Sequence, residues 1–198
     1  MVRRRLTLVL RPFMVLVMVA ALPSAVVAGD KSARVGSGAG SGDHCVRHLE
    51  YIEPTGPQAY VASETCFSTF AESMRHATGG HTKLNVDAKP NSVTQGDLPA
   101  AGTAATIVLG IDWDWVGYKE ESILWEASTG CDAGHWYVVG YVGNAWNDRI
   151  ESAKGFNGCV RFRHFEHQNY GGAKIVCTPN CFSMGTMTRE TSSLHFDN

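Results

Sequence analysis

Short apolar runs separated by turn residues dominate the chain after residue 105, and they predict β-strands. The run Thr106–Leu109 leads into an aromatic segment, Trp113–Tyr118, and the apolar run Ser122–Trp125 follows. Further runs continue to the C-terminus: Trp136–Val142, Ala153–Phe156, Cys159–Phe165, Lys174–Cys177 and Thr191–Phe196. Strands this short, with turns this frequent, are typical of an all-β sandwich.

The segment before residue 105 has a mixed pattern. An alternating run over Val46–Tyr51 predicts a strand that turns at Pro54–Pro57 and pairs with Gln58–Val61. Thr69 opens a capping-box pattern, Thr-Phe-Ala-Glu, and the apolar spacing after it predicts a short helix that ends at two glycines. These features predict a small α/β segment.

The N-terminus has the pattern of a secretory signal peptide. A cluster of arginines precedes the apolar run Phe13–Leu22, and small residues lead to a predicted cleavage site after Ala28. The run is too short for a membrane helix, which needs about 20 apolar residues, and Pro23 breaks it. We therefore expect a secreted, extracellular protein with no membrane span in the mature chain.

The patterns divide the chain into five parts. After the signal peptide, residues 1–28, the Gly/Ser-rich residues 29–44 predict a flexible leader. Residues 45–80 form the small N-terminal segment. Residues 81–104 contain two prolines and few apolar residues, which predicts a linker or long surface loop. Residues 105–198 form the all-β domain.

The charge of the mature chain argues against binding to nucleic acid. Four of the 17 basic residues and none of the 19 acidic residues lie in the signal peptide, so the mature chain has a net charge of −6. An acidic balance gives no electrostatic footprint for nucleic acid or for anionic membranes.

All six cysteines follow the signal peptide, and an even count in an exported chain predicts three disulfides. They are Cys45, Cys66, Cys131, Cys159, Cys177 and Cys181. Cys45 and Cys66 share the N-terminal segment and are expected to pair. Three pairings remain for the other four, and Cys131–Cys159 with Cys177–Cys181 keeps each bridge within one unit. The alternative for the last two is a metal site, but no second nearby Cys/His pair completes four ligands.

An internal repeat organises the all-β domain. Phe165 and Tyr170 lie 52 positions after Trp113 and Tyr118, and an apolar run follows each pair. Such self-similarity indicates a duplicated structural unit. Gly172 of the later copy supplies the positive φ that a sharp fold-back needs, and the aromatic pair of each copy is expected to cover the bend.

Polar stretches with a common pattern follow the two copies, Asn147–Ser152 and Thr188–Ser193. With the aromatic-x4-aromatic-x-Gly spacing, they resemble the Greek-key motifs of the βγ-crystallin family over about residues 105–198. The chain is similar to secreted bacterial proteins of this type, including the group of metalloproteinase inhibitors and killer toxins. The resemblance implies an all-β, two-motif Greek-key β-sandwich (βγ-crystallin-like), here with a small disulfide-stapled N-terminal α/β segment.

The same resemblance implies a calcium clamp between the two loops, because hard cations prefer several oxygen ligands. The implied ligands are Asn147, Asp148, Glu151, Ser152 and Ser192. Two departures weaken such a site. Glu151 stands where the family has Ser or Thr, and Thr188 and Arg189 stand where it has acids or amides. The alternative is that the loops are structural corners held by local hydrogen bonds. No cofactor is expected to be required, and calcium is an optional ligand.

No catalytic constellation emerges from the sequence. His164-Phe165-Glu166-His167 lacks the helical spacing of a metalloprotease motif and belongs to the aromatic fold-back. No serine lies in a nucleophile-elbow motif, and the cysteines are assigned to disulfides. Alternation along the predicted strand places Trp115 outward, as a contact for a sugar or a protein.

The sequence thus predicts a secreted, non-enzymatic, monomeric protein with a structural or weakly calcium-binding function. Two alternatives remain, a metalloproteinase inhibitor and a secreted antimicrobial toxin. The partner would be an extracellular proteinase or a cell-surface component. An inhibitor needs a rigid exposed loop, and the segments Cys177–Cys181 and 126–134 are the candidates.

Overall fold

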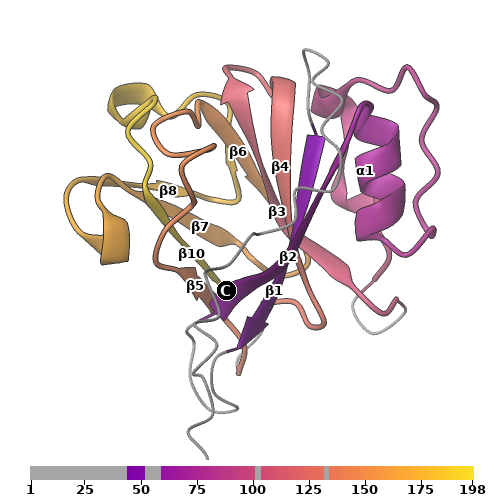
Figure 1. Cartoon of the computed structure of the whole chain (residues 1–198), viewed down its shortest axis with the longest axis horizontal. Helices are drawn as coiled ribbons and strands as arrows, with labels where there is room; N and C mark the ends of the chain where they lie inside the picture. Colours follow the sequence, from indigo (N-terminus) through magenta and orange to yellow (C-terminus); the bar gives the residue numbers. More distant parts are fainter. Residues whose placement is uncertain (1–43, 52–58, 101–103, 132–133) are drawn as a thin grey trace, which may run out of the picture. The chain divides into compact units, whose positions relative to one another are not determined.

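Ten strands and one α-helix make up the regular structure of the residues that the computed structural model describes, 44–51, 59–100, 104–131 and 134–198 (Figure 1). The predicted signal peptide and the leader up to residue 43 lie outside these ranges. The strands are β1 (His44–Tyr51), β2 (Ala59–Phe67), β3 (Ile107–Trp115), β4 (Lys119–Ala127), β5 (Tyr137–Val139), β6 (Ser152–Gly155), β7 (Arg161–Phe165), β8 (Lys174–Cys177), β9 (Asn180–Cys181) and β10 (Ser193–Asp197). The α-helix is α1 (Phe70–Ala77), and the short 3-10 helices are η1 (Pro90–Ser92), η2 (Gln95–Asp97), η3 (Gln168–Tyr170) and η4 (Gly185–Met187). No helix within the described ranges is long and apolar enough to span a bilayer.

The strands form two sheets with a Greek-key connection. One sheet has the order β2-β1-β4-β3-β6-β9 and the other β5-β10-β7-β8. The first motif is β3 to β6 and the second is β7 to β10. Each motif gives its third strand to the sheet of the other, because β5 pairs with β10 and β9 pairs with β6. The predicted two-motif sandwich is therefore confirmed.

The inner core lies between the two sheets. Its largest side chains include Trp125 of the first motif and Phe162 and Phe196 of the second, all fully buried. The period of two along a strand sends neighbouring residues to opposite faces. In β4, Ile123 and Trp125 join the inner core, whereas Leu124 between them joins a second core on the outer face of the same sheet.

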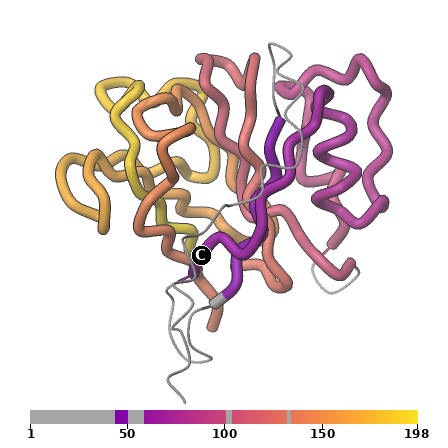
Figure 2. Tube along the Cα trace, viewed as in Figure 1, coloured from indigo at the N-terminus to yellow at the C-terminus, as the bar shows by residue number. Residues whose placement is uncertain are grey.

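Helix α1 covers this outer face. Phe70 and Met74 of the helix pack with Trp113, Leu124 and other outer-face residues. In Figures 1 and 2, α1 and the four-stranded sheet lie on opposite sides of the six-stranded sheet. The helix begins as predicted, since the Thr69 hydroxyl accepts a hydrogen bond from the Glu72 backbone N–H at 3.2 Å. This cap satisfies a donor that the first turn leaves without a partner.

The predicted linker also packs on the outer face. Val93 and Leu98 are buried in the outer core, although the described part of residues 81–104 contains no α-helix or β-strand. Lys154 of β6 fixes this segment, because its Nζ donates to the carbonyls of Asn91 and Val93 at 3.0 and 2.8 Å. The same ammonium lies 4.4 Å from the centre of the Tyr118 ring. A cation over an aromatic face stabilises such a contact further.

The N-terminal hairpin extends the six-stranded sheet. Strands β1 and β2 pair antiparallel, as the sequence predicts, and β1 also pairs in parallel with β4, with Cys45 opposite Ile123. Arg47 of β1 donates to the carbonyl of Val142, which follows β5 of the second sheet, and it forms an ion pair with Glu64 of β2. Strand β1 thus shields the β4 edge, which would otherwise present unpaired backbone groups.

The three disulfides are those expected from the sequence. Cys45–Cys66 joins directly opposed residues of the N-terminal hairpin. Cys131–Cys159 links the segment after β4 to the segment before β7, and Cys177–Cys181 closes the short turn between β8 and β9. The three predicted pairs are confirmed, although Cys131–Cys159 joins the first motif to the connection between the two motifs.

The two fold-back turns share their backbone conformation. Three pairs of residues 52 positions apart have positive φ angles: Gly117 and Asn169, Tyr118 and Tyr170, and Glu120 and Gly172. The aromatic pair of each turn makes an edge contact, with ring centres 5.2 Å apart for Trp113–Tyr118 and 5.8 Å for Phe165–Tyr170. The first turn therefore adopts the fold-back even though Glu120 stands where the second has glycine.

Glu126, where β4 meets β1, gives the fold a pH dependence. Burial raises the pKa of its carboxyl from the usual 4.5 to about 7, and a hydrogen bond from Thr106 opposes the shift. His48 Nδ1 of β1 lies 3.4 Å from its Oε1. Between about pH 4.5 and 7, the Glu126 carboxyl keeps its proton in the folded protein but has lost it in the unfolded chain. The contribution of Glu126 to the free energy of unfolding must therefore fall as the pH rises through this range.

The Glu126→Gln variant tests this dependence. It should remove a loss of about 1–3 kcal/mol in unfolding free energy that the wild type shows between about pH 4.5 and 7. Urea unfolding at several pH values measures the difference between the two proteins, which separates Glu126 from the other titrating groups. Parallel curves for the two proteins would contradict the assignment.

Candidate functional site

The two polar loops of the motifs lie against each other and form the candidate site. Asn147–Ser152 leads into β6 and Thr188–Ser193 leads into β10, and equivalent positions are 41 residues apart. The backbone N–H of Asp148 donates to the Thr191 carbonyl at 3.1 Å. The N–H of Arg189, the equivalent residue, donates to the Ile150 carbonyl at 3.0 Å. Each loop thus holds the other through the same position.

The last serine of each loop fastens the fold-back turn of its own motif. The Ser152 hydroxyl donates to the Trp115 carbonyl at 2.7 Å and accepts from the Tyr118 N–H at 3.0 Å. The Ser193 hydroxyl makes the same two bonds in the second motif, to His167 and from Tyr170, at 2.7 and 3.0 Å. A hydroxyl used as both donor and acceptor closes a turn that the backbone alone leaves open.

The second position of each loop has a left-handed backbone. Asp148 has φ of 58° and Arg189 has φ of 62°. Such values are uncommon outside glycine, asparagine and aspartate, so Arg189 is held there by its surroundings. The two side chains carry opposite charges, and this is the main asymmetry between the loops.

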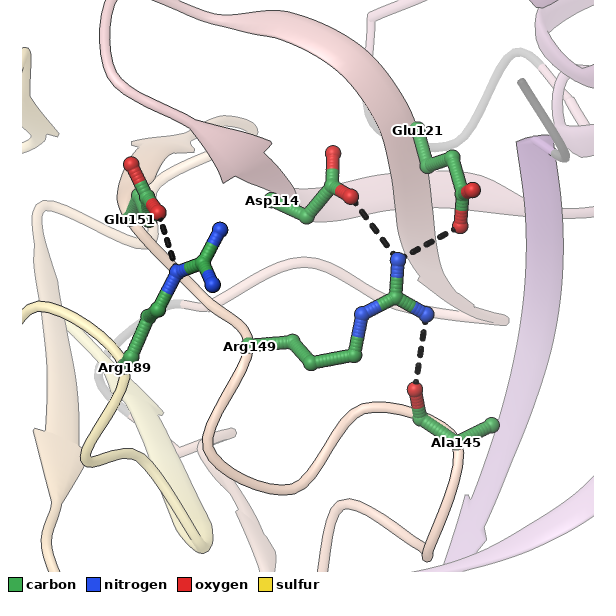
Figure 3. Close-up of polar contacts among 6 residues, drawn as sticks. All are labelled: Asp114, Glu121, Ala145, Arg149, Glu151 and Arg189. Atoms are coloured by element: carbon green, nitrogen blue, oxygen red, sulfur yellow. Dashed lines mark hydrogen bonds and ion pairs between the residues drawn. The ribbon is translucent and has the colours of Figure 1, made fainter. Parts of the chain in front are cut away.

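Arg189 forms an ion pair across the loop interface. Its Nε donates to Glu151 Oε1 at 2.5 Å (Figure 3). The Glu151 side chain is 10% exposed, whereas that of Arg189 is 58% exposed. Glu151 is further fixed by its backbone, which donates to the Trp113 carbonyl and accepts from the Met184 N–H. The carboxylate therefore faces the guanidinium from a fixed position.

Arg149 forms a second network beside the first. Its Nη2 donates to Asp114 Oδ2 at 2.8 Å and to Glu121 Oε2 at 2.7 Å, and its Nη1 donates to the Ala145 carbonyl at 3.1 Å (Figure 3). Burial raises the pKa of the Asp114 carboxyl, and the hydrogen bond from Arg149 opposes that shift. The network ties the first loop to the β3–β4 hairpin.

The implied calcium ligands are close in the chain but differ in what they offer a cation. Asp148 is exposed, and its carboxylate accepts from the Asn147 side chain at 2.6 Å. Ser192 is buried, and its backbone N–H donates to the Phe165 carbonyl at 2.8 Å. Ser152 uses its hydroxyl in the turn and Glu151 faces Arg189. The loop pair has two halves, one in which Glu151 faces Arg189 and one that contains Asp148 and Ser192. The Glu151 half does not fit a calcium ion, which would need several free oxygens there.

Sequence reasoning missed most of these polar partners. The only signals for the Arg149 network in the sequence are an arginine in the first loop and the acidic residues Asp114 and Glu121 near the first fold-back turn, and no spacing links them. The sequence shows Arg189 at a position where the βγ-crystallin family has an acid or an amide, but it gives no sign of the contact with Glu151. Within the described ranges, no group of three or more His, Cys, Asp or Glu side chains could hold a metal ion.

A buried polar pair joins the two motifs at equivalent positions. His164 lies 52 residues after Asp112, and its Nε2 is 2.8 Å from Asp112 Oδ1. Asp112 Oδ2 accepts from Trp125 Nε1, also at 2.8 Å. The side chains of Asp112 and His164 are both fully buried. The prediction that His164 is structural fits this position, where the pair links β3 to β7 across the inner core.

Strand order, fold-back turns and crossed loops together define a βγ-crystallin-like, two-motif Greek-key sandwich. A solved structure described as the crystal structure of a betagamma-crystallin from an archaeon is similar to this chain, with 22% identity and a TM-score of 0.34. The match covers 45% of this chain and 96% of that one. No family model and no curated protein matches the sequence.

Proposed function

We propose that the protein is a secreted, non-enzymatic Greek-key protein with a structural function, in which calcium binds at most weakly. The observation that supports it best is the use of the loop side chains. Ser152 and Ser193 close turns, Glu151 pairs with Arg189, and Arg149 joins two carboxylates. Groups so engaged hold a fold together and are not available for substrate.

Secretion is the second part of the proposal. It is supported by the signal-peptide pattern of residues 1–28 and by three disulfides, which persist in oxidising compartments. A small extracellular domain gains stability from such bridges, because they restrict the unfolded chain.

Any calcium would bind in the half of the loop pair that contains Asp148 and Ser192. Asp148 is exposed and carries no ion pair with a described cationic side chain. One carboxylate with few neighbouring oxygens gives a weak site, with a Kd on the order of 0.1–1 mM. Such a site would serve stability and not signalling.

Calorimetry of the mature protein with calcium tests this half. At about 5 mM calcium we expect a rise in unfolding free energy of about 1–2.5 kcal/mol, since linkage grows only as the logarithm of ligand over Kd. Asp148→Ala should abolish the rise and leave the fold intact, because the side chain is exposed. Asp148→Asn, which keeps one oxygen, is the matched control and should retain part of it. No response in the wild type would remove calcium from the proposal.

A second candidate function, inhibition of an extracellular proteinase, is favoured by the segment around Cys177–Cys181. The disulfide closes its turn, the Pro179 carbonyl accepts from the Gly155 N–H at 2.9 Å, and Phe182 beyond it is 65% exposed. A rigid exposed loop is what a proteinase cleft needs, because little entropy is lost on binding. Inhibition of a metalloproteinase that Phe182→Ala weakens at least about tenfold would support this candidate. The toxin hypothesis has no comparable observation.

A further inference from the structure

We infer that the guanidinium of Arg189 takes the place of a metal cation in the Glu151 half of the loop pair. The chain would then neutralise this carboxylate itself. The inference deepens the proposed structural function and rests on it, because it concerns how the same loops are closed. It adds that the two halves differ in the source of their cation. The Glu151 half uses the Arg189 guanidinium, and the half with Asp148 can bind calcium weakly from solution.

The two halves of the loop pair are structurally equivalent. Arg189 and Asp148 occupy the same loop position, have the same left-handed backbone and make the same hydrogen bond to the opposite loop. The second position of one loop faces the fifth position of the other, as the Arg189–Glu151 contact shows. In the other half, the residues at these positions are Asp148 and Ser192. The second loop position therefore carries a positive charge in one half, at Arg189, and a negative charge in the other, at Asp148.

The carboxylate of Glu151 is largely buried. A carboxylate with a side chain only 10% exposed has lost most of its water and needs a cation or several donors nearby. A guanidinium supplies both, because it is always charged and donates hydrogen bonds in a fixed plane. Asp148 is exposed and needs no such partner. The arginine thus stands in the half where the need for a cation is greatest.

Arg189 and a calcium ion would compete for Glu151. A calcium ion at Glu151 would lie beside the Arg189 guanidinium, and two cations on one carboxylate repel each other. The Ser152 hydroxyl next to Glu151 is already a donor to the Trp115 carbonyl and an acceptor from Tyr118. Calcium would have to displace the arginine to bind there. In the wild type, any calcium response must therefore be independent of Glu151.

Exchange of the arginine for an oxygen ligand tests the inference. Thermal unfolding of the mature protein is compared with and without about 5 mM calcium at constant ionic strength, for the wild type, Arg189→Asp, Glu151→Gln and the double variant. Arg189→Asp should melt below the wild type in chelator and gain about 3–6 °C with calcium. The double variant should lose that gain. Arg189→Met, which removes the charge without adding an oxygen, is the matched control and should gain at most about 1 °C.

Two outcomes would overturn the inference. One is a wild-type calcium response that Glu151→Gln abolishes, because it would mean that metal displaces Arg189. The other is an Arg189→Asp variant that gains nothing from calcium, because the position would then not be one that a metal can occupy. Should Arg189→Asp fail to fold, Arg189→Asn offers a neutral oxygen at the same position, with a smaller expected gain. A calcium response of the wild type that Asp148→Ala abolishes and Glu151→Gln does not would support the inference. A wild type that does not respond to calcium would contradict only the weak site proposed at Asp148.

Discussion

Replacement of Asp112 by alanine is expected to lower the free energy of unfolding by about 3–5 kcal/mol. The Asp112 carboxylate accepts hydrogen bonds from His164 Nε2 and Trp125 Nε1, each at 2.8 Å, in the fully buried inner core. Without it, two buried donors would lose their acceptor. His164 Nδ1 has no hydrogen-bond partner among the described residues, so the ring cannot compensate by using its other nitrogen.

Urea unfolding of the mature protein measures this loss. The Asp112→Asn variant is the matched control, because it has the same size and keeps an oxygen acceptor for one of the two donors. It should cost about half as much as the alanine variant. An Asp112→Ala protein that unfolds at the wild-type urea concentration would contradict a role for this pair in joining the motifs.

The Gly172→Val variant is expected to cost about 2–4 kcal/mol. Gly172 has φ of 76°, which a β-branched residue strongly disfavours. A Cβ there would also lie 2.7 Å from Glu166 Oε2 and 2.8 Å from Glu166 Cβ. The Glu166 carboxylate is held in place because it accepts from the Ala173 N–H at 2.8 Å. Conformational strain and collision therefore add.

Gly185→Val separates the two causes. Gly185 has φ of 56°, and a Cβ there would meet no atom within 4 Å. This variant should lose only about 1 kcal/mol, the conformational part of the effect. Equal losses at the two positions would show that Glu166 moves aside without cost. A Gly172→Val protein as stable as the wild type would contradict the fold-back account of the repeat.

The fold could be predicted because its signals are local and repeated. Trp113 with Tyr118, and Phe165 with Tyr170, mark both fold-back turns at one spacing, and the strands between them follow from short apolar runs. The structure extends this repeat to the backbone, where Glu120 adopts the conformation of Gly172. That extension was not predictable, because a glutamate gives no indication of a positive φ.

Contacts between distant segments were the features that the sequence did not reveal. The parallel pairing of β1 with β4 joins residues about 80 positions apart, and no periodicity indicates it. The two-residue strand β9 is too short to leave a pattern. The pair Arg189–Glu151 spans two loops and depends on how the motifs cross. By contrast, Asp112–His164 follows the repeat spacing of 52, so the repeat could have revealed it.

The central claim is that an internal ion pair closes the loops between the two motifs. A double-mutant cycle on Arg189→Met and Glu151→Gln, followed by urea unfolding, tests it most directly. We predict a stabilising coupling energy of about 0.5–1 kcal/mol at low salt, since Arg189 is largely exposed. The coupling should shrink at high salt and stay unchanged when calcium is added at constant ionic strength. A coupling energy of zero, or one that calcium abolishes, would contradict the claim.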